Sequence, residues 1–598
     1  MAVSVVDAIA FGLDNDIAGM NPVGMNVYGA FDSVNAASSY ADFFAPLKTT
    51  LVLSRGTGSP TFTRATTAYV KDFEDVWRQV PSGAARFEGA RVVVNGCPGY
   101  RPLSGFGTTE TSTTIDDPLG GSNAGRYRID NAASYQRYFT FSSLSGTTVV
   151  GSAYLRGVGT SVGKSVGLWL YDNGTTVSAV VTLTSDWKRF TPAARTNTTG
   201  GVDCRIGIAG FIGGTIALNE EVDICCGQGE NVTGASNQAP SEWVSKAVLS
   251  APYHGAGADG IKYFATENGN SVASNVVTEA TGAAIPDATL KGYFSEGQRQ
   301  NRCIHAQDFT NAAWVSGGGG IAVTPNTAVA PDGTTTADTL TASGANGTLI
   351  QDLGVVASAA KAGGLYLKRK TGTGNIDLTL DGGATWTTVA VTSSWLLLEK
   401  TQTLADEDFG IRIVTSGDEV YSWQGQVETA AFISSVIPTT TAAVTRNASV
   451  ISYPSSGNIA AAAGAVYLEF TPQHAPVGTI ALFGTYVDAN NYTAILHDAT
   501  NLIFRKRIAA SNYDATIANA FVAGTTYKVA ASWGSGGTSI VLDGTVGTPH
   551  ANTTNAQIGT TIQIGADGNG AQQPFASIKN SKLWQTAKTD AQLQALTT

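Results

Sequence analysis

The clearest pattern along the chain is the two-residue alternation of apolar and other side chains that is typical of β-strands. In the segment VGLWLYD, Val166, Leu168 and Leu170 fall on one face of an extended strand. Trp169 and Tyr171 fall on the opposite face. Similar stretches are separated by Asn-Gly, Gly-Asn and Asp-Gly turns at the spacing of a sandwich. The pattern predicts a mainly β fold of serial antiparallel β-sandwiches.

One module occurs twice. The segments GSAYLRG, VGLWLYDNG, TSDWKRF and GQGE between residues 151 and 230 return as GGLYLKR, IDLTLDGG, TSSWLLLEK and GQVE between residues 363 and 428. Trp187 and Trp395 occupy equal positions in the two copies, so we expect both in the module core. Because neither copy shows a helical period, we expect each to be two packed sheets.

The remaining chain divides by the same criteria. Thr589 with Gln592 three residues later forms a capping-box pattern, which predicts a short terminal helix. The second linker, residues 246–304, is too long to be a loop without secondary structure. We therefore expect it to contain short strands, which two subunits could share. The predicted parts are an N-terminal segment 1–60, a linker with short strands 61–115, a first module 116–245, a second linker with short strands 246–304, a second module 305–447 and a final sandwich 448–598.

Composition and charge exclude several classes of protein. Charged residues make up only 14% of the 598 residues, which disfavours long amphipathic helices. The net charge of −10 offers no basic field for nucleic acid or for anionic lipid. No apolar stretch approaches the roughly 20 residues of a membrane span, and the N-terminus lacks the basic region of a secretion signal. We therefore expect neither nucleic-acid binding nor membrane insertion.

The reactive residue types show no catalytic or metal-binding spacing. Five cysteines are too few for a disulfide framework, and we expect buried, reduced thiols. Cys225 and Cys226 are adjacent, which places them poorly for bonding to each other. The histidines form no HExxH motif, and neither a GxSxG elbow nor a phosphate-binding loop is present. We therefore expect no enzyme.

Several segments resemble recurring parts of tailed-bacteriophage structural proteins. They are SPTFTRATTAYV at 59–70, LSAPYHGAGADGIKYFATENGN at 249–270, LKGYFSEGQRQNRCIHAQDFTNAAW at 290–314 and VIPTTTAAVTRNA at 436–448. In such proteins these segments flank jelly rolls similar to carbohydrate-binding modules. The C-terminal run YKVAASW, SIVLDGTVG and KLWQTAKTDAQLQAL resembles the laminin-G-like, concanavalin-A-like sandwich of phage fibre tips.

The resemblance implies a virion protein, a trimeric tail fibre or appendage assembled in the host cytoplasm and located on the tail or capsid exterior. Residues 1–60 would bind other virion proteins, the two jelly rolls would form a shaft, and the C-terminal sandwich would contact a host-surface glycan. One alternative is a capsid-decorating or tail-sheathing protein that binds only virion proteins. A third hypothesis is a capsule depolymerase, although the sequence lacks the short repeat of a β-helix.

Glycan binding needs aromatic faces for stacking, with amides and carboxylates for the hydroxyl groups. Trp169 and Tyr171 share a strand face in the first module, and Asp172 follows them. The second copy has Asp377 and Thr379 at the matching positions and no aromatic residue there. We therefore favour the first copy for binding, with the alternative that Trp169 packs beneath a neighbouring segment or subunit.

Two turns of the final sandwich are further candidates. The first contains Tyr486, Asn490, Asn491 and Tyr492, and the second contains Asp567 and Asn569. Turn formation alone also explains these polar residues.

An acidic run, residues 406–408, suggests calcium. A single loop does not supply the six to eight oxygen ligands that calcium takes, so a solvated loop is the favoured interpretation. We therefore assign no metal and no cofactor.

Overall fold

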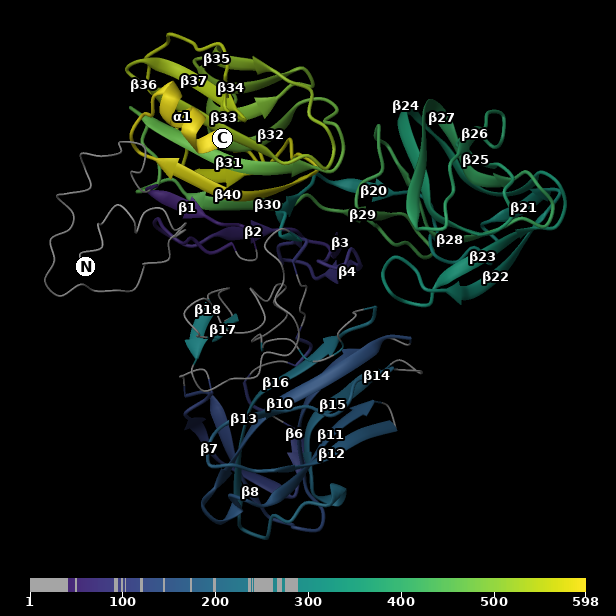
Figure 1. The fold of residues 1–598 in the computed structure, drawn as a ribbon, viewed down its shortest axis with the longest axis vertical. Coiled ribbons are helices and arrows are strands. Elements are labelled where there is room, and N and C mark those ends of the chain that lie inside the picture. The colour runs from purple at the N-terminus through teal and green to yellow at the C-terminus, as the bar shows by residue number, and fades with distance from the viewer. Residues whose placement is uncertain are drawn as a thin grey trace, which may run out of the picture. The chain divides into compact units, whose positions relative to one another are not determined.

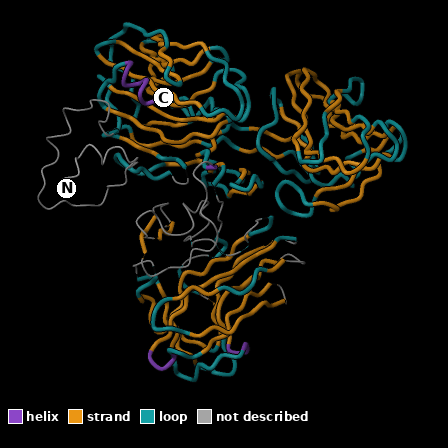
Figure 2. Tube along the Cα trace, in the orientation of Figure 1, coloured by secondary structure: helices purple, strands orange, loops and turns teal. Residues whose placement is uncertain are grey.

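The computed structural model describes residues 41–598 and forms one compact unit over Ala41–Thr598. Within this range the description omits 49–50, 91–94, 98–99, 103, 119–121, 144–145, 173–174, 197–200, 235–237, 239, 241–242, 244–261, 266–270 and 275–288. Most of the predicted attachment segment, up to residue 40, lies outside the described residues. The fold is mainly β with antiparallel strand pairing, as the alternation predicted (Figures 1 and 2).

The first repeated module is a sandwich of two sheets. One sheet contains β7 (Thr108–Ile115), β8 (Ala124–Ile129), β10 (Thr148–Val158), β13 (Lys188–Phe190), β14 (Arg195–Thr196) and β16 (Glu221–Asn231). The other, in the order β12-β11-β15-β9-β6, contains β6 (Ser104–Phe106), β9 (Gln136–Ser143), β11 (Ser165–Asp172), β12 (Thr175–Thr182) and β15 (Gly201–Ala209). Val166, Leu168 and Leu170 enter the core between the sheets, as predicted.

The second module is a single eight-stranded sheet that curls around its own core. It contains β21 (Val315–Gly318), β22 (Ile321–Ala328), β23 (Ala337–Ala342), β24 (Gly347–Thr371), β25 (Ile376–Thr379), β26 (Thr387–Val389), β27 (Leu396–Ile413) and β28 (Glu419–Glu428). The long strand β24 pairs with β21 near its start and with β28 near its end. This change of partner lets one sheet supply both layers of the core.

The C-terminal sandwich also has two sheets. The first contains β1 (Phe43–Ala45), β5 (Phe87–Glu88), β19 (Gly292–Ser295), β31 (Gly464–Pro472), β36 (Tyr527–Gly534), β37 (Gly537–Leu542), β38 (Thr545–Val546) and β40 (Ala576–Trp584). The second contains β2 (Thr61–Thr63), β30 (Val450–Pro454), β32 (Ile480–Asp488), β33 (Asn491–His497), β34 (Asn501–Ile508), β35 (Ser511–Ala518) and β39 (Thr561–Ile564).

Strands from distant parts of the chain therefore complete the C-terminal sandwich. β1 and β19 pair with β40, β5 pairs with β19, and β2 pairs with β30. Their residues lie in the segments that the sequence analysis treated as an N-terminal segment and as linkers. Phe43, Phe87 and Tyr293 are buried in the same core as the strands of residues 450–583.

Three two-stranded ladders, the short 3-10 helices η1 (Gly159–Ser161) and η2 (Gly210–Ile212), and one α-helix complete the described elements. The ladders are β3 (Ala68–Lys71) with β4 (Trp77–Val80), β17 (Lys262–Ala265) with β18 (Ser271–Ser274), and β20 (Arg299–Asn301) with β29 (Val444–Arg446). Helix α1 spans Asp590–Thr597, and its N-cap Thr589 exchanges hydrogen bonds with Gln592, which confirms the capping box. Within the described residues, no helix has the length and apolar character to cross a bilayer.

The two copies share an asparagine clamp that the sequence comparison did not detect. The side chain of Asn95 accepts hydrogen bonds from the backbone of Cys97 and Gly229. Asn301 does the same for Cys303 and Val427. In both copies the side-chain amide also donates to a carbonyl of the last long strand. The clamp fixes the segment that enters each module against that strand.

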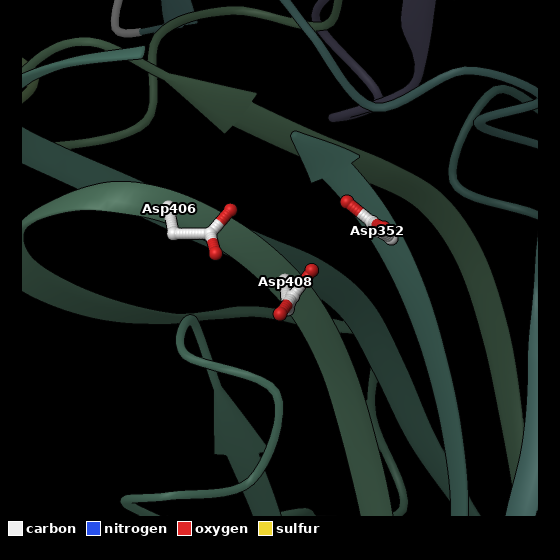
Figure 3. A group of neighbouring side chains, drawn as sticks. All are labelled: Asp352, Asp406 and Asp408. Atoms are coloured by element: carbon white, nitrogen blue, oxygen red, sulfur yellow. The ribbon is translucent and has the colours of Figure 1, made fainter. Parts of the chain in front are cut away.

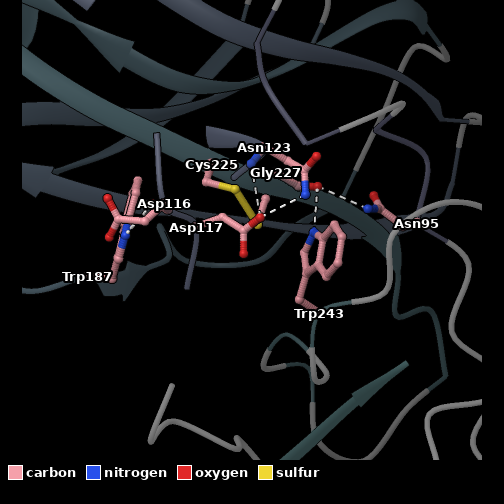
Figure 4. Close-up of a disulfide and its surroundings, with 9 residues drawn as sticks. Asn95, Asp116, Asp117, Asn123, Trp187, Cys225, Gly227 and Trp243 are labelled. Atoms are coloured by element: carbon pink, nitrogen blue, oxygen red, sulfur yellow. Dashed lines mark hydrogen bonds between the residues drawn. A yellow bond between two sulfur atoms is a disulfide. The ribbon is translucent and has the colours of Figure 1, made fainter. Parts of the chain in front are cut away.

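The expectation about adjacent cysteines is wrong. Cys225 and Cys226 form a disulfide (Figure 4), whereas Cys97 and Cys303 are buried, as expected. Cys226 has a left-handed backbone with φ of 58°, and the β10–β16 register shifts at this point. Since the extended geometry is interrupted, the two side chains no longer point to opposite faces. Trp243 is fully buried in the cluster that contains the disulfide.

Candidate functional site

The predicted aromatic face exists on the five-stranded sheet of the first sandwich. Trp169 on β11 stands opposite Gly207 on β15, and Gly207 stands opposite Tyr138 on β9. A Cβ atom at Gly207 would lie 2.1 Å from the backbone oxygen of Arg137, so the position takes no side chain. The Trp169 and Tyr138 rings therefore meet across the glycine strand, with their centroids 5.9 Å apart.

Trp169 is the support of this face rather than its exposed surface. Its side chain is only 2% exposed, and its ring contacts Tyr138, Tyr171 and Phe211 edge-on at 5.4–6.0 Å. Its indole N–H is buried and has no hydrogen-bond partner in the described part of the chain. Trp169 itself is therefore packed, and its packing partners are the other aromatic residues of the same face. Phe211 is 55% exposed, and both tyrosines are partly exposed.

A guanidinium group lies among these rings. Arg205 pairs with Tyr171 across the β11–β15 ladder, and its charged carbon lies 4.6 Å from the ring centre of Tyr138 and 5.1 Å from that of Tyr171. Such cation–π contacts hold both rings and the guanidinium in place. The face thus combines aromatic rings that can stack on the C–H groups of a sugar with a charged hydrogen-bond donor. Asp172 ends β11, and its side chain lies outside the described parts.

The matching face of the second module is occupied by an ion pair. Asp377 is 2% exposed and accepts two hydrogen bonds from Arg412 at 2.6 and 2.9 Å and one from Thr388 at 2.7 Å. The indole of Trp386, which the sequence analysis missed, lies 4.5 Å from the Arg412 guanidinium. This face offers no row of aromatic rings from neighbouring strands comparable with that of the first module.

The structure places the first predicted turn of the C-terminal sandwich between β32 and β33. Tyr486 and Tyr492 are directly opposite across this hairpin, with nearly parallel rings 6.4 Å apart. Asp488 accepts from the backbone of Asn490 and from the side chain of Asn491. These hydrogen bonds hold the pKa of Asp488 below its usual value, and the bond from the Asn491 side chain has the largest effect. The amide and carboxylate groups therefore stabilise the turn. The tyrosine pair is the part of this hairpin that could contact a ligand.

The second predicted turn follows the same pattern. Asp567 accepts hydrogen bonds from the backbone of Asn569 and Ala571 at 2.9 and 3.0 Å, which closes the loop on itself. The loop packs against β32 at Gly484, where an added Cβ would lie 2.2 Å from the carbonyl carbon of Asp567. The two predicted turns thus lie on neighbouring parts of one sheet, but their polar groups stabilise the loops.

The acidic run of the second module divides between two environments. Glu407 is fully buried and forms ion pairs with Lys361 and Arg302. Asp406 and Asp408 instead gather with Asp352, with ligand oxygens within 4.8 Å of one another (Figure 3). Burial and the neighbouring carboxylates raise the pKa of Asp408. Three carboxylates supply only part of the oxygen shell that calcium takes.

Solved structures of known proteins match only about a quarter of the chain. No protein-family model and no curated protein matches the sequence. Domain 4 of AbnA, a GH43 extracellular arabinanase from Geobacillus stearothermophilus in complex with arabinotriose, is 18% identical over 25% of this chain and 73% of its own, with a TM-score of 0.23. The binding domain of botulinum neurotoxin serotype G is 8% identical over 25% of this chain and 39% of its own, with a TM-score of 0.22. At these identities and TM-scores, the similarity does not indicate a function for this chain.

Proposed function

We propose that this protein binds glycans as a non-enzymatic structural protein of a bacteriophage appendage. The observation that carries the binding role is the face of the first sandwich, where Tyr138, Tyr171 and Phe211 surround a buried tryptophan beside Arg205. Planar aromatic side chains with an adjacent charged donor are suited to a sugar ring. The virion assignment rests on the resemblance of the flanking segments to phage structural proteins.

The first sandwich is a better candidate for this contact than the end turns of the C-terminal sandwich. The polar groups of those turns are engaged in hydrogen bonds within the loops. The parallel pair Tyr486 and Tyr492 is the second candidate for the same role. Several copies in a trimeric appendage would raise a weak single-site affinity through multivalency.

The test measures binding of the full-length protein to purified host-surface polysaccharide. The double variant Tyr171→Ala with Phe211→Ala should weaken binding about tenfold, because each aromatic contact contributes roughly 0.5–1.5 kcal/mol. Trp386→Ala in the second module removes an aromatic ring without touching the proposed face and should leave binding unchanged.

Three outcomes would change the assignment. If Tyr492→Ala abolishes binding while the double variant does not, the C-terminal sandwich is the contact. If the wild-type protein binds no host glycan but binds purified virion proteins, it decorates or sheathes the particle. If the polysaccharide becomes shorter during incubation, the protein is a depolymerase.

A further inference from the structure

A pocket of about 330 Å³ lies away from the aromatic face, where five segments of the chain meet. They are the start of β20 with the residues before it, the segment after β28, strand β29, and the loops β31–β32 and β39–β40 of the C-terminal sandwich. Ser434 and Arg446 line the pocket and are buried, whereas Val477 and Gln572 are exposed. The pocket is therefore a recess with a buried floor, of a size suited to one small ligand.

One wall of the pocket is a stack of rings. Phe432 lies nearly parallel to the imidazole of His474, with centroids 4.3 Å apart, and to Phe575 at 5.3 Å. The guanidinium of Arg299 lies 5.4 Å from the centre of the Phe432 ring. The stack fixes an apolar surface beside a positive charge, a combination that suits a ring-shaped ligand with an anionic group.

Several hydrogen-bond donors of Arg299 are unused. Its Nη1 donates to the backbone oxygen of Gln298 at 3.3 Å, and its Nε lies 3.5 Å from Glu428 without forming a hydrogen bond. Nη2 has no hydrogen-bond partner among the described residues. By contrast, Arg446 uses Nη1 for Ser434 and Nη2 for Gly297. Arg299 lines the pocket and its side chain is 31% exposed, whereas its Nε is buried, so Nη1 and Nη2 are the nitrogen atoms left for a ligand.

The ion pairs around the pocket leave Arg299 as its least engaged charged group. Arg299 and Arg446 are directly opposite across the β20–β29 ladder, where like charges destabilise pairing. Glu296, the acid that lines the pocket, is buried and forms ion pairs with Arg86 and Arg446. Burial, first of all, lowers the pKa of Arg446 to about 10 and raises that of Glu428. An anion in the pocket would therefore meet Arg299, whose nearest acid, Glu428, lies 3.5 Å away.

We propose that this pocket binds a monosaccharide-sized ligand that carries a carboxylate, such as a uronic acid. Its carboxylate accepts from Nη1 and Nη2 of Arg299, and its ring lies against the wall formed by Phe432 and His474. Charge-assisted hydrogen bonds from arginine are strong and geometrically selective for carboxylates. The site is independent of the aromatic face in the first sandwich and does not depend on the function proposed for it.

The experiment titrates glucuronate, glucose and inorganic phosphate separately into the full-length protein and follows binding by ligand-observed NMR. Glucuronate should bind at least about tenfold more tightly than glucose, because the neutral sugar lacks the group that Arg299 recognises. Arg299→Gln should abolish that preference, and Arg299→Lys should restore part of it. Arg128→Gln, on an exposed arginine of the first sandwich, removes the same charge elsewhere and should have no effect.

Each alternative result overturns the proposal in a distinct way. Equal binding of glucuronate and glucose would exclude recognition of the carboxylate. Phosphate binding as tight as that of glucuronate would show a general anion site without sugar selection. Loss of glucuronate binding in Tyr171→Ala, with full binding in Arg299→Gln, would move the ligand to the first sandwich. Unfolding temperatures of the variants separate loss of binding from loss of folding.

Discussion

The two repeated sandwiches share a tryptophan contact but differ on one outer face. The expectation that both tryptophans lie in the module core holds for Trp187, whereas Trp395 is partly exposed. In both sandwiches, the tryptophan at the repeated position donates its indole N–H to a backbone oxygen at 3.0 Å, from Trp187 to Asp116 and from Trp395 to Val329. The outer face carries Trp169 and its aromatic neighbours in one copy and the buried carboxylate of Asp377 in the other. Because alternate residues of a strand face opposite sides, a face can change while the core contacts stay.

The largest expected effect concerns what the copies share. Asn95→Ala and Asn301→Ala would each leave several buried backbone groups without a partner, since each asparagine accepts two backbone N–H groups. Each substitution should lower the free energy of unfolding of its own sandwich by roughly 3 kcal/mol, at about 1–3 kcal/mol per unsatisfied group. Local hydrogen exchange would measure the two sandwiches separately. A negligible effect in either copy would show that the clamp is not a common stabilising element.

A smaller effect should separate the two repeated tryptophans. Trp187→Phe and Trp395→Phe both remove the hydrogen bond of the indole, but Trp187 is 7% exposed and Trp395 is more exposed. We expect a loss of about 1–2 kcal/mol for Trp187→Phe and less than about 1 kcal/mol for Trp395→Phe. Thermal unfolding of both variants measures the difference. The reverse order would mean that the repeat position contributes more to the second core than its exposure indicates.

The smallest effect tests the acidic cluster of the second sandwich through pH. The pKa of Asp408 is raised, so the folded state binds its proton more tightly than the unfolded state does. Stability therefore falls as the pH rises from about 4 through the raised pKa. Asp408→Asn should stabilise the protein at pH 7 by less than about 1 kcal/mol, and the gain should shrink as the pH falls.

Asp130 in the first sandwich is the matched control for this titration. The hydrogen bond from Thr109, followed by that from Arg128, lowers the pKa of Asp130. The effect of pH on stability is therefore opposite to that expected for Asp408. Asp130→Asn should destabilise the protein at neutral pH, and the loss should disappear as the pH falls through that lowered pKa. Unfolding temperatures of both variants between pH 3 and pH 7 provide the measurement. The same pH trend in both variants would contradict the opposite pKa shifts of Asp408 and Asp130.

Local patterns in the sequence were sufficient to predict the mainly β fold, the repeat and the terminal helix. They did not reveal the partners of Phe43–Ala45 and Gly292–Ser295, because β40 lies hundreds of residues away and pairing leaves no local signal. The same limit applied to the aromatic face. The alternation on β11 identified Trp169 and Tyr171, whereas Tyr138 and Arg205 join them only through the strand register. The disulfide required a left-handed residue at Cys226 that no pattern indicates.

The pairing of β40 with β1 and β19 has a consequence for the order of events on the ribosome. β1 emerges about 530 residues before β40, and at about 5–20 residues per second its partner follows roughly half a minute to two minutes later. During that interval both repeated sandwiches can fold, while β1 and β19 remain without their final neighbour. The nascent chain therefore exposes unpaired apolar strands late into synthesis, and the last hundred residues close the sheet that the first described strands began.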